Sequence, residues 1–170
     1  MKKLLVLMMA ITLSLSLAAC GEDITLQRQT VNDITLDIPS DFGEFNEVAE
    51  QIYMAKNEDS TATITISERV DAQGITPDLW DEEAFVANVM VGFNEPQVLE
   101  FSNTETALGT AAVYARYTGR NSSDVEVEGY SYILYFDDGT YQSVAFSFTK
   151  DKDSALKQNL TSIIDSMKKG

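Results

Sequence analysis

The sequence predicts an α+β fold, in which one antiparallel β-sheet carries two main helices packed on it. Several short segments alternate apolar and polar residues, as strands with one buried face do. Two longer segments repeat apolar residues every three or four positions, as amphipathic helices do. These segments follow the order strands, helix, strands, helix, which is typical of helices packed on an antiparallel sheet. With 44% hydrophobic and 23% charged residues, the chain has a globular composition.

The first twenty residues form a separate region. Two lysines precede the apolar run Leu4–Leu17, and two alanines separate that run from Cys20, the only cysteine. A positive start, an apolar middle and a small-residue end are typical of a secretory signal peptide, and the run is shorter than the roughly 20 residues that span a bilayer. We therefore expect residues 1–19 to be removed, residues 20–23 to form a short tether, and residues 24–170 to fold as one domain.

The motif Leu17-Ala18-Ala19-Cys20 resembles the lipobox of bacterial lipoproteins. The resemblance implies cleavage between Ala19 and Cys20 and a diacylglyceryl group on the Cys20 sulfur. Two acyl chains hold a protein stably on a bilayer, whereas one holds it marginally. The implied location is the extracytoplasmic face of a bacterial cell membrane, with the lipid on Cys20 as the membrane contact.

Extended segments are predicted on both sides of a central helix. Those before it cover 24–26, 34–38, 52–55 and 62–66, and those after it cover 98–101, 111–118, 130–136 and 141–148. Turn residues at Asn32-Asp33 and a polar stretch at 56–61 connect the early segments. Asp138-Gly139 predicts a two-residue type I′ hairpin.

Helices are predicted over 77–93 and 153–168. Thr76 and Pro77 fit the start of the first helix, whose apolar stripe is Phe85, Val89 and Phe93. Asp153 fits the cap of the second helix. The apolar face of that helix comprises Leu156, Leu160, Ile163, Ile164 and Met167, and the helix is expected to end at Lys168-Lys169-Gly170.

The segment Ile38-Pro39-Ser40-Asp41-Phe42 resembles PsbP-like domains, in which an opening strand ends in Ile-Pro and an aromatic residue follows. The order of elements extends the resemblance over residues 24–168. It implies an α/β/α sandwich with a central antiparallel sheet and an accessory or binding role. It implies no specific ligand, and no functional residue is carried over from it.

The composition excludes several kinds of chemistry. Without His, and with one Cys, the chain has no imidazole ligand, no His-activated nucleophile and no intrachain disulfide. The net charge is −15, and loss of residues 1–19 with their two lysines makes it −17, which argues against nucleic acid as a partner. No cofactor and no metal are predicted. Lys168 and Lys169 are expected either to end a solvated helix or to face an anionic bilayer.

Three motifs have both a chemical and a structural interpretation. Ser154 and Lys157 match the S-x-x-K nucleophile pattern, but they also fit the exposed first turn of a helix. Asp81-Glu82-Glu83 would suit Ca²⁺ or, as we favour, complement a helix dipole. Asp137 and Asp138 would suit a cation, although turn formation already accounts for Asp138.

Tyrosines are concentrated in the later strands, where they would form sheet core and cross-strand pairs, stack on a sugar or grip a partner protein. They are Tyr114, Tyr117, Tyr130, Tyr132, Tyr135 and Tyr141.

The function predicted from the sequence is that of a non-enzymatic, lipid-anchored binding or accessory domain of a bacterial cell envelope, with an envelope protein as the expected partner. A small solute-binding lipoprotein is an alternative and would need a deep cleft with convergent polar groups. A carboxylate-dependent hydrolase is a second alternative and would need a close pair of buried acids. A shallow aromatic or acidic face would instead favour a protein partner.

Overall fold

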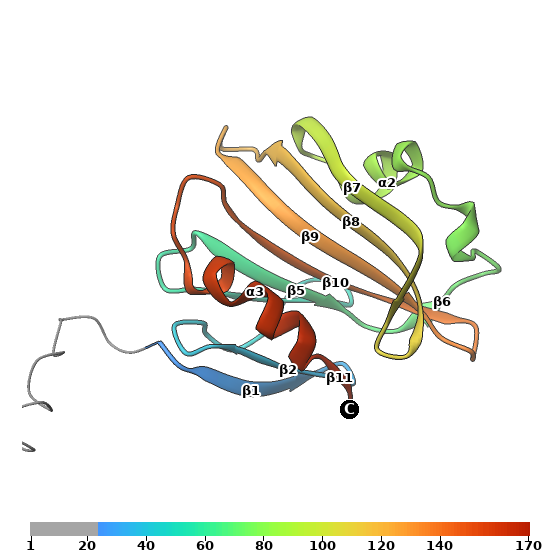
Figure 1. The fold of residues 1–170 in the computed structure, drawn as a ribbon, viewed down its shortest axis with the longest axis horizontal. Helices are drawn as coiled ribbons and strands as arrows, with labels where there is room; N and C mark the ends of the chain where they lie inside the picture. Colours follow the sequence, from blue (N-terminus) through green and yellow to red (C-terminus); the bar gives the residue numbers. More distant parts are fainter. Residues whose placement is uncertain (1–23) are drawn as a thin grey trace, which may run out of the picture.

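The computed structural model describes residues 24–170 (Figure 1). The expected signal peptide, the cut at Ala19–Cys20 and the tether 20–23 lie outside the described residues. A large sheet has the strand order β3-β4-β5-β10-β9-β8-β7, with β6 paired to β10, and a small sheet has the order β1-β2-β11. All strand pairs are antiparallel.

The strands of the large sheet are β3 (Asn46–Ala49), β4 (Ile52–Lys56), β5 (Ala62–Ser67), β6 (Val70–Asp71), β7 (Asn94–Ala107), β8 (Thr110–Arg120), β9 (Glu126–Tyr135) and β10 (Thr140–Thr149). The small sheet comprises β1 (Leu26–Val31), β2 (Ile34–Pro39) and β11 (Lys168–Lys169). The helices are the 3₁₀ turn η1 (Pro77–Leu79), α2 (Glu82–Val89) and α3 (Ala155–Ser166). The predicted α+β class is therefore confirmed.

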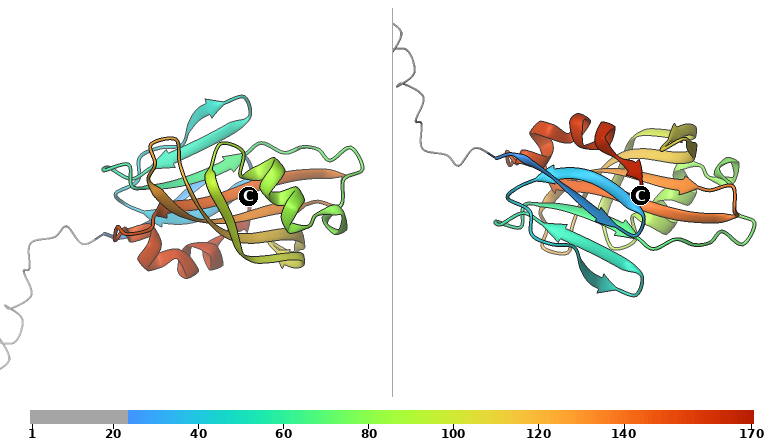
Figure 2. Two further views of the ribbon diagram at one scale, coloured as in Figure 1. Left: turned by 90° about the horizontal axis from the view of Figure 1, so that it is seen from above. Right: turned by 90° about the horizontal axis from the view of Figure 1, so that it is seen from below.

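One face of the large sheet is covered by α3 and β2 (Figure 1). The interior of this layer holds alternate residues of β2, β5 and β10, because successive strand residues point to opposite faces. Its fully buried members include Leu36, Ile64 and Phe146, and α3 adds Leu156 and Ile163. In both views of Figure 2, α3 and the β3–β4 hairpin lie on opposite sides of the molecule.

The opposite face of the sheet, over β7 and β8, carries α2. Phe85 of α2 is fully buried, and its ring contacts those of Phe101 and Tyr117, with centroids 6.3 and 5.9 Å apart. Val89 and Phe93 pack against the same cluster. Phe85 and Val89 are thus confirmed on the packed face of α2, whereas Phe93 lies beyond the end of the helix.

The first predicted helix is shorter than expected and is interrupted. Trp80 is extended, with φ −94° and ψ 135°, and Asp81 then caps α2 by accepting a hydrogen bond from the Ala84 amide at 2.8 Å. Thr76 makes no side-chain cap hydrogen bond. The break lets the Trp80 indole donate to the Tyr135 hydroxyl at 2.6 Å, a tertiary contact that a continuous helix would not allow.

The last helix also differs at both ends. Its cap is Ser154, which accepts a hydrogen bond from the Lys157 amide at 3.2 Å, and not Asp153. The helix ends at Ser166, because the backbone of Met167 is extended (φ −58°, ψ 133°). Lys168 and Lys169 therefore form β11 on the edge of β2 and do not end the helix.

The turns follow the backbone preferences of their residues. Asn32 and Asp33 both have positive φ, 47° and 62°, which defines the type I′ turn between β1 and β2. Asp138-Gly139 does not form the predicted type I′ turn, because only Gly139 has a positive φ, of 78°. The Gly139 amide donates to the Phe136 carbonyl at 3.0 Å, so a type I turn precedes the glycine.

Three short strands, β3, β6 and β11, and most of β1 and β7 were not predicted, and the segment predicted at 24–26 shares only Leu26 with β1. They are short, exposed or irregular, and β7 pairs with β8 through three register shifts. Such bulges interrupt the apolar alternation on which the strand prediction depends. Within residues 24–170, no helix has the length and apolar character needed to cross a bilayer.

Candidate functional site

The sheet divides the six tyrosines between its two faces. Tyr117, Tyr135 and Tyr141 point to the α2 side, where Tyr117 is buried and the rings of Tyr135 and Tyr141 stack with centroids 6.0 Å apart. For these three, the interpretation as sheet core and cross-strand pairs is correct.

The other three tyrosines belong to a surface that we call the tyrosine face. It consists of Tyr114, Arg116, Tyr130, Tyr132, Glu100 and Glu128, which lie on β7, β8 and β9. In Figure 1, α3 crosses in front of β5 and β10 and does not cover these strands along their length. Tyr114 and Tyr132 pair across β8 and β9, with ring centroids 5.1 Å apart. The three tyrosines and Arg116 are half-buried.

Arg116 holds the tyrosine face together across three strands. Its Nη1 lies 3.0 Å from Glu100 Oε1 and its Nε lies 2.8 Å from Glu128 Oε1. The guanidinium carbon is 5.6 Å from the centroid of the Tyr130 ring, within cation–π range. The Tyr130 hydroxyl donates to Glu128 Oε1 at 3.1 Å. These bonds already hold the side chains in place in the free protein. A partner would therefore bind with a smaller loss of side-chain conformational entropy.

The phenol and guanidinium groups of this surface keep their charge state over physiological pH. Burial, and then the charge of Glu100, raises the pKa of Tyr114, so its phenol stays neutral. The hydrogen bonds that Arg116 donates to Glu128 and Glu100 raise the pKa of Arg116, which stays cationic. Burial, followed by the charges of Glu105 and Asp165, raises the pKa of Tyr132.

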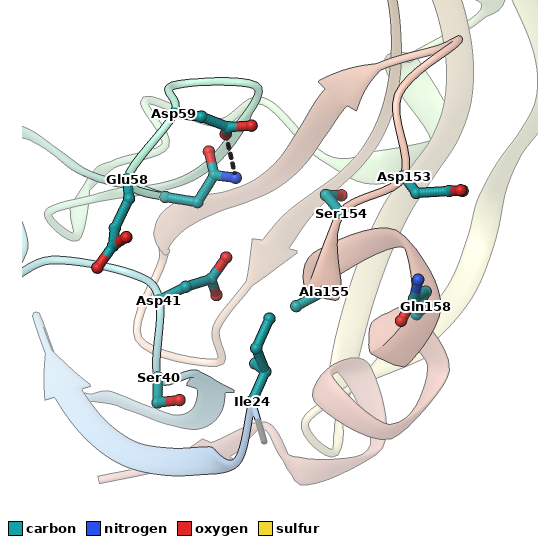
Figure 3. Close-up of a pocket in the computed structure, with 10 residues that line it drawn as sticks. Ile24, Ser40, Asp41, Glu58, Asp59, Asp153, Ser154, Ala155 and Gln158 are labelled. Carbon is teal, nitrogen blue, oxygen red and sulfur yellow. Dashed lines mark hydrogen bonds between the residues drawn. The ribbon is translucent and has the colours of Figure 1, made fainter. Parts of the chain in front are cut away.

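An open pocket of about 540 Å³ lies at the end of the domain where the described chain begins (Figure 3). Its lining residues are Ile24, Ser40, Asp41, Asn57, Glu58, Asp59, Asp153, Ser154, Ala155 and Gln158. The Asp41 carboxylate points into the pocket, whereas Glu58 and Asp153 point away from it (Figure 3). Asp41 Oδ1 is buried without a hydrogen-bond partner, and this burial raises the pKa of the carboxyl group.

Asp59, next to Asp41, is committed to its own loop. Its Oδ1 accepts hydrogen bonds from the Asn57 amide group at 2.7 Å, the Thr61 hydroxyl at 2.6 Å and the Thr61 backbone amide at 3.2 Å. The bonds from Thr61 lower the pKa of Asp59. Asp59 therefore closes the β4–β5 turn, and no Asp or Glu belongs to the fully buried polar residues of the described chain.

A second hollow lies between α2 and the edge strand β7. Val86, Pro96 and Val98 give it an apolar lining, together with Ala87 and the stems of Glu82 and Glu83. It faces the α2 side, away from the tyrosine face.

The S-x-x-K motif forms a helix cap. The Ser154 hydroxyl accepts from the Lys157 backbone amide, and Lys157 Nζ donates to the Lys150 carbonyl oxygen at 2.9 Å. The expectation that Ser154 is exposed is wrong, since only 7% of the residue is accessible. The side-chain contacts of Ser154 and Lys157 are thus those of a capped helix.

The acidic motifs have structural contacts as well. Asp81 caps α2, with Glu82 and Glu83 in its first turn. Asp138 accepts from the Thr140 amide at 3.1 Å and pairs with Arg69 Nη2 at 3.1 Å. In residues 24–170, no group of three or more Cys, Asp or Glu side chains is arranged to hold a metal ion.

The fold is similar to those of solved proteins of two kinds. The solution structure of cyanobacterial PsbP (CyanoP) from Synechocystis sp. PCC 6803 superposes with a TM-score of 0.61 at 12% identity, over 91% of this chain and 99% of that chain. The Saccharomyces cerevisiae Ran-binding protein Mog1p superposes with a TM-score of 0.57 at 12% identity, over 86% and 96% of the two chains. At this identity the likeness shows a shared PsbP- and Mog1-like fold.

No family model and no curated protein sequence matches the chain. The tyrosine face therefore has to be interpreted from its own chemistry. Sequence reasoning identified Tyr114, Tyr130 and Tyr132 but missed Arg116, Glu100 and Glu128. In the sequence, Arg116, Glu100 and Glu128 appear only as charged residues within alternating strands. That pattern does not indicate which residues become cross-strand neighbours.

Proposed function

We propose that this protein is a lipid-anchored, extracytoplasmic domain of a bacterial cell envelope that binds a protein partner through the tyrosine face. The motif Leu17-Ala18-Ala19-Cys20 supports the anchor, and the ordered surface of tyrosine and arginine supports the binding role. Lipidation would confine the domain near the bilayer and raise its effective concentration toward a partner on the same membrane.

The composition of the tyrosine face is that of a protein-binding surface. Tyrosine and arginine are enriched at the centres of protein interfaces, and both commonly carry much of the binding energy. Here Tyr114, Tyr130, Tyr132 and Arg116 lie together on three adjacent strands and are held by cross-strand hydrogen bonds. A partner would thus meet an aromatic surface that is already ordered.

The position of Ile24 supports a defined orientation on the membrane. Residue 24 lies at one end of the β1–β2 hairpin, and the C-terminal strand β11 pairs with its other end (Figure 1). Lys168 and Lys169 are therefore separated from the tether end by the length of the hairpin, about 20 Å for six residues. In the proposed orientation the Ile24 end faces the bilayer. Lys168 and Lys169 then lie on a solvent-exposed surface away from the bilayer.

The anchor is tested by changing the modified residue. Cys20→Ser removes the sulfur that would receive the lipid, so the variant should leave the membrane fraction while the wild-type chain stays there. Ser16→Ala is the matched control, because it alters the leader outside the lipobox and should leave membrane association unchanged. A Cys20→Ser variant that stays in the membrane fraction as the wild type does would contradict the lipid anchor.

The binding surface is tested by photo-crosslinking in living cells. A photoreactive amino acid at Tyr114 should capture a discrete protein, and the same amino acid at Thr65, on the opposite face of the sheet, should not. Arg116→Ala should reduce the capture from position 114, because it removes the bridge between Glu100 and Glu128. Equal capture from both positions would contradict a role for the tyrosine face.

A further inference from the structure

The tyrosine face already contains one site for a cation, filled by the protein itself. The Arg116 guanidinium lies over the Tyr130 ring and is bound by the Glu100 and Glu128 carboxylates. An aromatic ring combined with carboxylates is thus an arrangement that holds a guanidinium in this fold.

The neighbouring part of the face has the same components without a cation. The Tyr114 and Tyr132 rings lie 5.1 Å apart, and the Tyr114 hydroxyl donates to Glu100 Oε2 at 3.2 Å. Glu105 is opposite Ala112 in the β7–β8 register, which places it on the same face as Tyr114, two positions along β8.

Glu105 is exposed and takes part in no ion pair within residues 24–170. The surroundings are acidic as well, because residues 20–149 contain 5 basic and 24 acidic side chains. This part of the face therefore complements a positive charge. Arginine suits it better than lysine, since a guanidinium both stacks on aromatic rings and pairs with carboxylates through its planar fork.

We propose that Tyr114 and Tyr132, with Glu105, receive an arginine side chain from a basic segment of the partner protein. This inference rests on the proposed function and specifies the chemistry of the partner. The proposed ligand of the tyrosine face is a cationic segment that contains arginine.

The test uses the full chain purified in detergent and three acetylated, amidated peptides. Their sequences are Gly-Arg-Gly-Arg-Gly-Arg-Gly and its counterparts with lysine or glutamate in place of arginine. The arginine peptide should bind most tightly, the lysine peptide more weakly and the glutamate peptide not at all. Amide chemical-shift changes should concentrate on residues 112–116 and 130–134.

Two variants and two matched controls locate the site. Tyr132→Leu should weaken binding of the arginine peptide about fivefold or more, through loss of the ring. Glu105→Gln should weaken it about twofold to fivefold, and this exposed substitution leaves the folded core unchanged. Tyr141→Leu and Glu83→Gln, which remove a ring and a charge on the α2 side, should change the affinity less than twofold.

If Glu105→Gln and Glu83→Gln reduced the affinity for the arginine peptide equally, the peptide would be attracted diffusely to an acidic protein. That result would overturn the inference. Unchanged affinity in both Tyr132→Leu and Glu105→Gln would do the same. This result is independent of the in-cell capture from position 114. Successful crosslinking from position 114 combined with a failed peptide test would contradict the arginine site alone. Failed crosslinking would contradict the proposed function.

Discussion

Gly129 shows how one missing side chain shapes the α2 side of the sheet. The Tyr117 ring lies across Gly129, so that a Cβ built on Gly129 would be 2.3 Å from Tyr117 Cζ. Gly129 faces Tyr117 directly in the β8–β9 register. The glycine is needed because the aromatic ring occupies the space of its side chain, and its backbone needs no positive φ.

Gly129→Ala should therefore destabilise the domain by about 1–3 kcal/mol, since overpacking a filled site forces neighbouring groups to move. Equilibrium unfolding in urea measures the change. Gly43→Ala is the control, because the nearest neighbour of a Cβ at Gly43 is the Lys56 carbonyl oxygen at 4.0 Å, an ordinary contact. A Gly129→Ala chain as stable as the wild type would contradict this packing.

Asp41 should make stability depend on pH. Burial raises its pKa in the folded state, so the folded chain retains this proton over a pH range in which the unfolded chain has lost it. Its contribution to stability therefore falls as pH rises from the unfolded pKa through the folded pKa, and stays low above that window.

Asp41→Asn removes this penalty and should raise the melting temperature at pH 7 while leaving it unchanged near pH 3. Thermal unfolding at several pH values checks the prediction. Asp153→Asn, an exposed change in the same pocket, is the matched control and should not raise the melting temperature at pH 7. A melting temperature for Asp41→Asn that tracks the wild type at every pH would exclude a penalty at this carboxyl group.

At the scale of elements, apolar periodicity predicted the helix faces more accurately than the helix ends. Leu156, Leu160 and Ile163 are buried as predicted, because the 3.6-residue period follows from helix geometry alone. The ends depend on competition among neighbouring caps and tertiary contacts. Ser154 displaces Asp153 as cap, and β2 converts Lys168-Lys169 from a helix end into a strand.

Ser154→Ala should cost about 1 kcal/mol, because it removes the acceptor that satisfies the Lys157 amide at the start of α3. Asp153→Ala is the matched control, as it removes the residue that the sequence pattern favoured as the cap. It should change the free energy of unfolding by less than about 0.5 kcal/mol. The opposite ranking of these two variants would assign the cap to Asp153.

The candidate site was predicted only in part, for a similar reason. Tyrosine enrichment indicated an aromatic surface, and strand alternation alone puts Tyr114 and Tyr117 on opposite faces. The cross-strand neighbours of Tyr114, however, depend on the strand register. The register of β7 is shifted at three places, which no local pattern in the sequence indicates. The cross-strand bridge of Arg116 therefore becomes evident only in the folded chain.

At the scale of the whole molecule, the structure and the leader sequence give complementary information. The described domain has a PsbP- and Mog1-like architecture, and a fold alone selects no function. The proposed role depends on two local features, the lipobox cysteine and the tyrosine face. In the proposed role, the first would confine the domain to a membrane, and the second would determine what it binds there.

The most direct test of this account is the intact mass of the protein isolated from its native membrane, together with fragmentation of its N-terminal peptide. The account predicts a chain that begins at Cys20 and carries a diacylglyceryl group on the sulfur. A chain that begins at Cys20 with an unmodified thiol, or that retains residues 1–19, would contradict the lipid anchor.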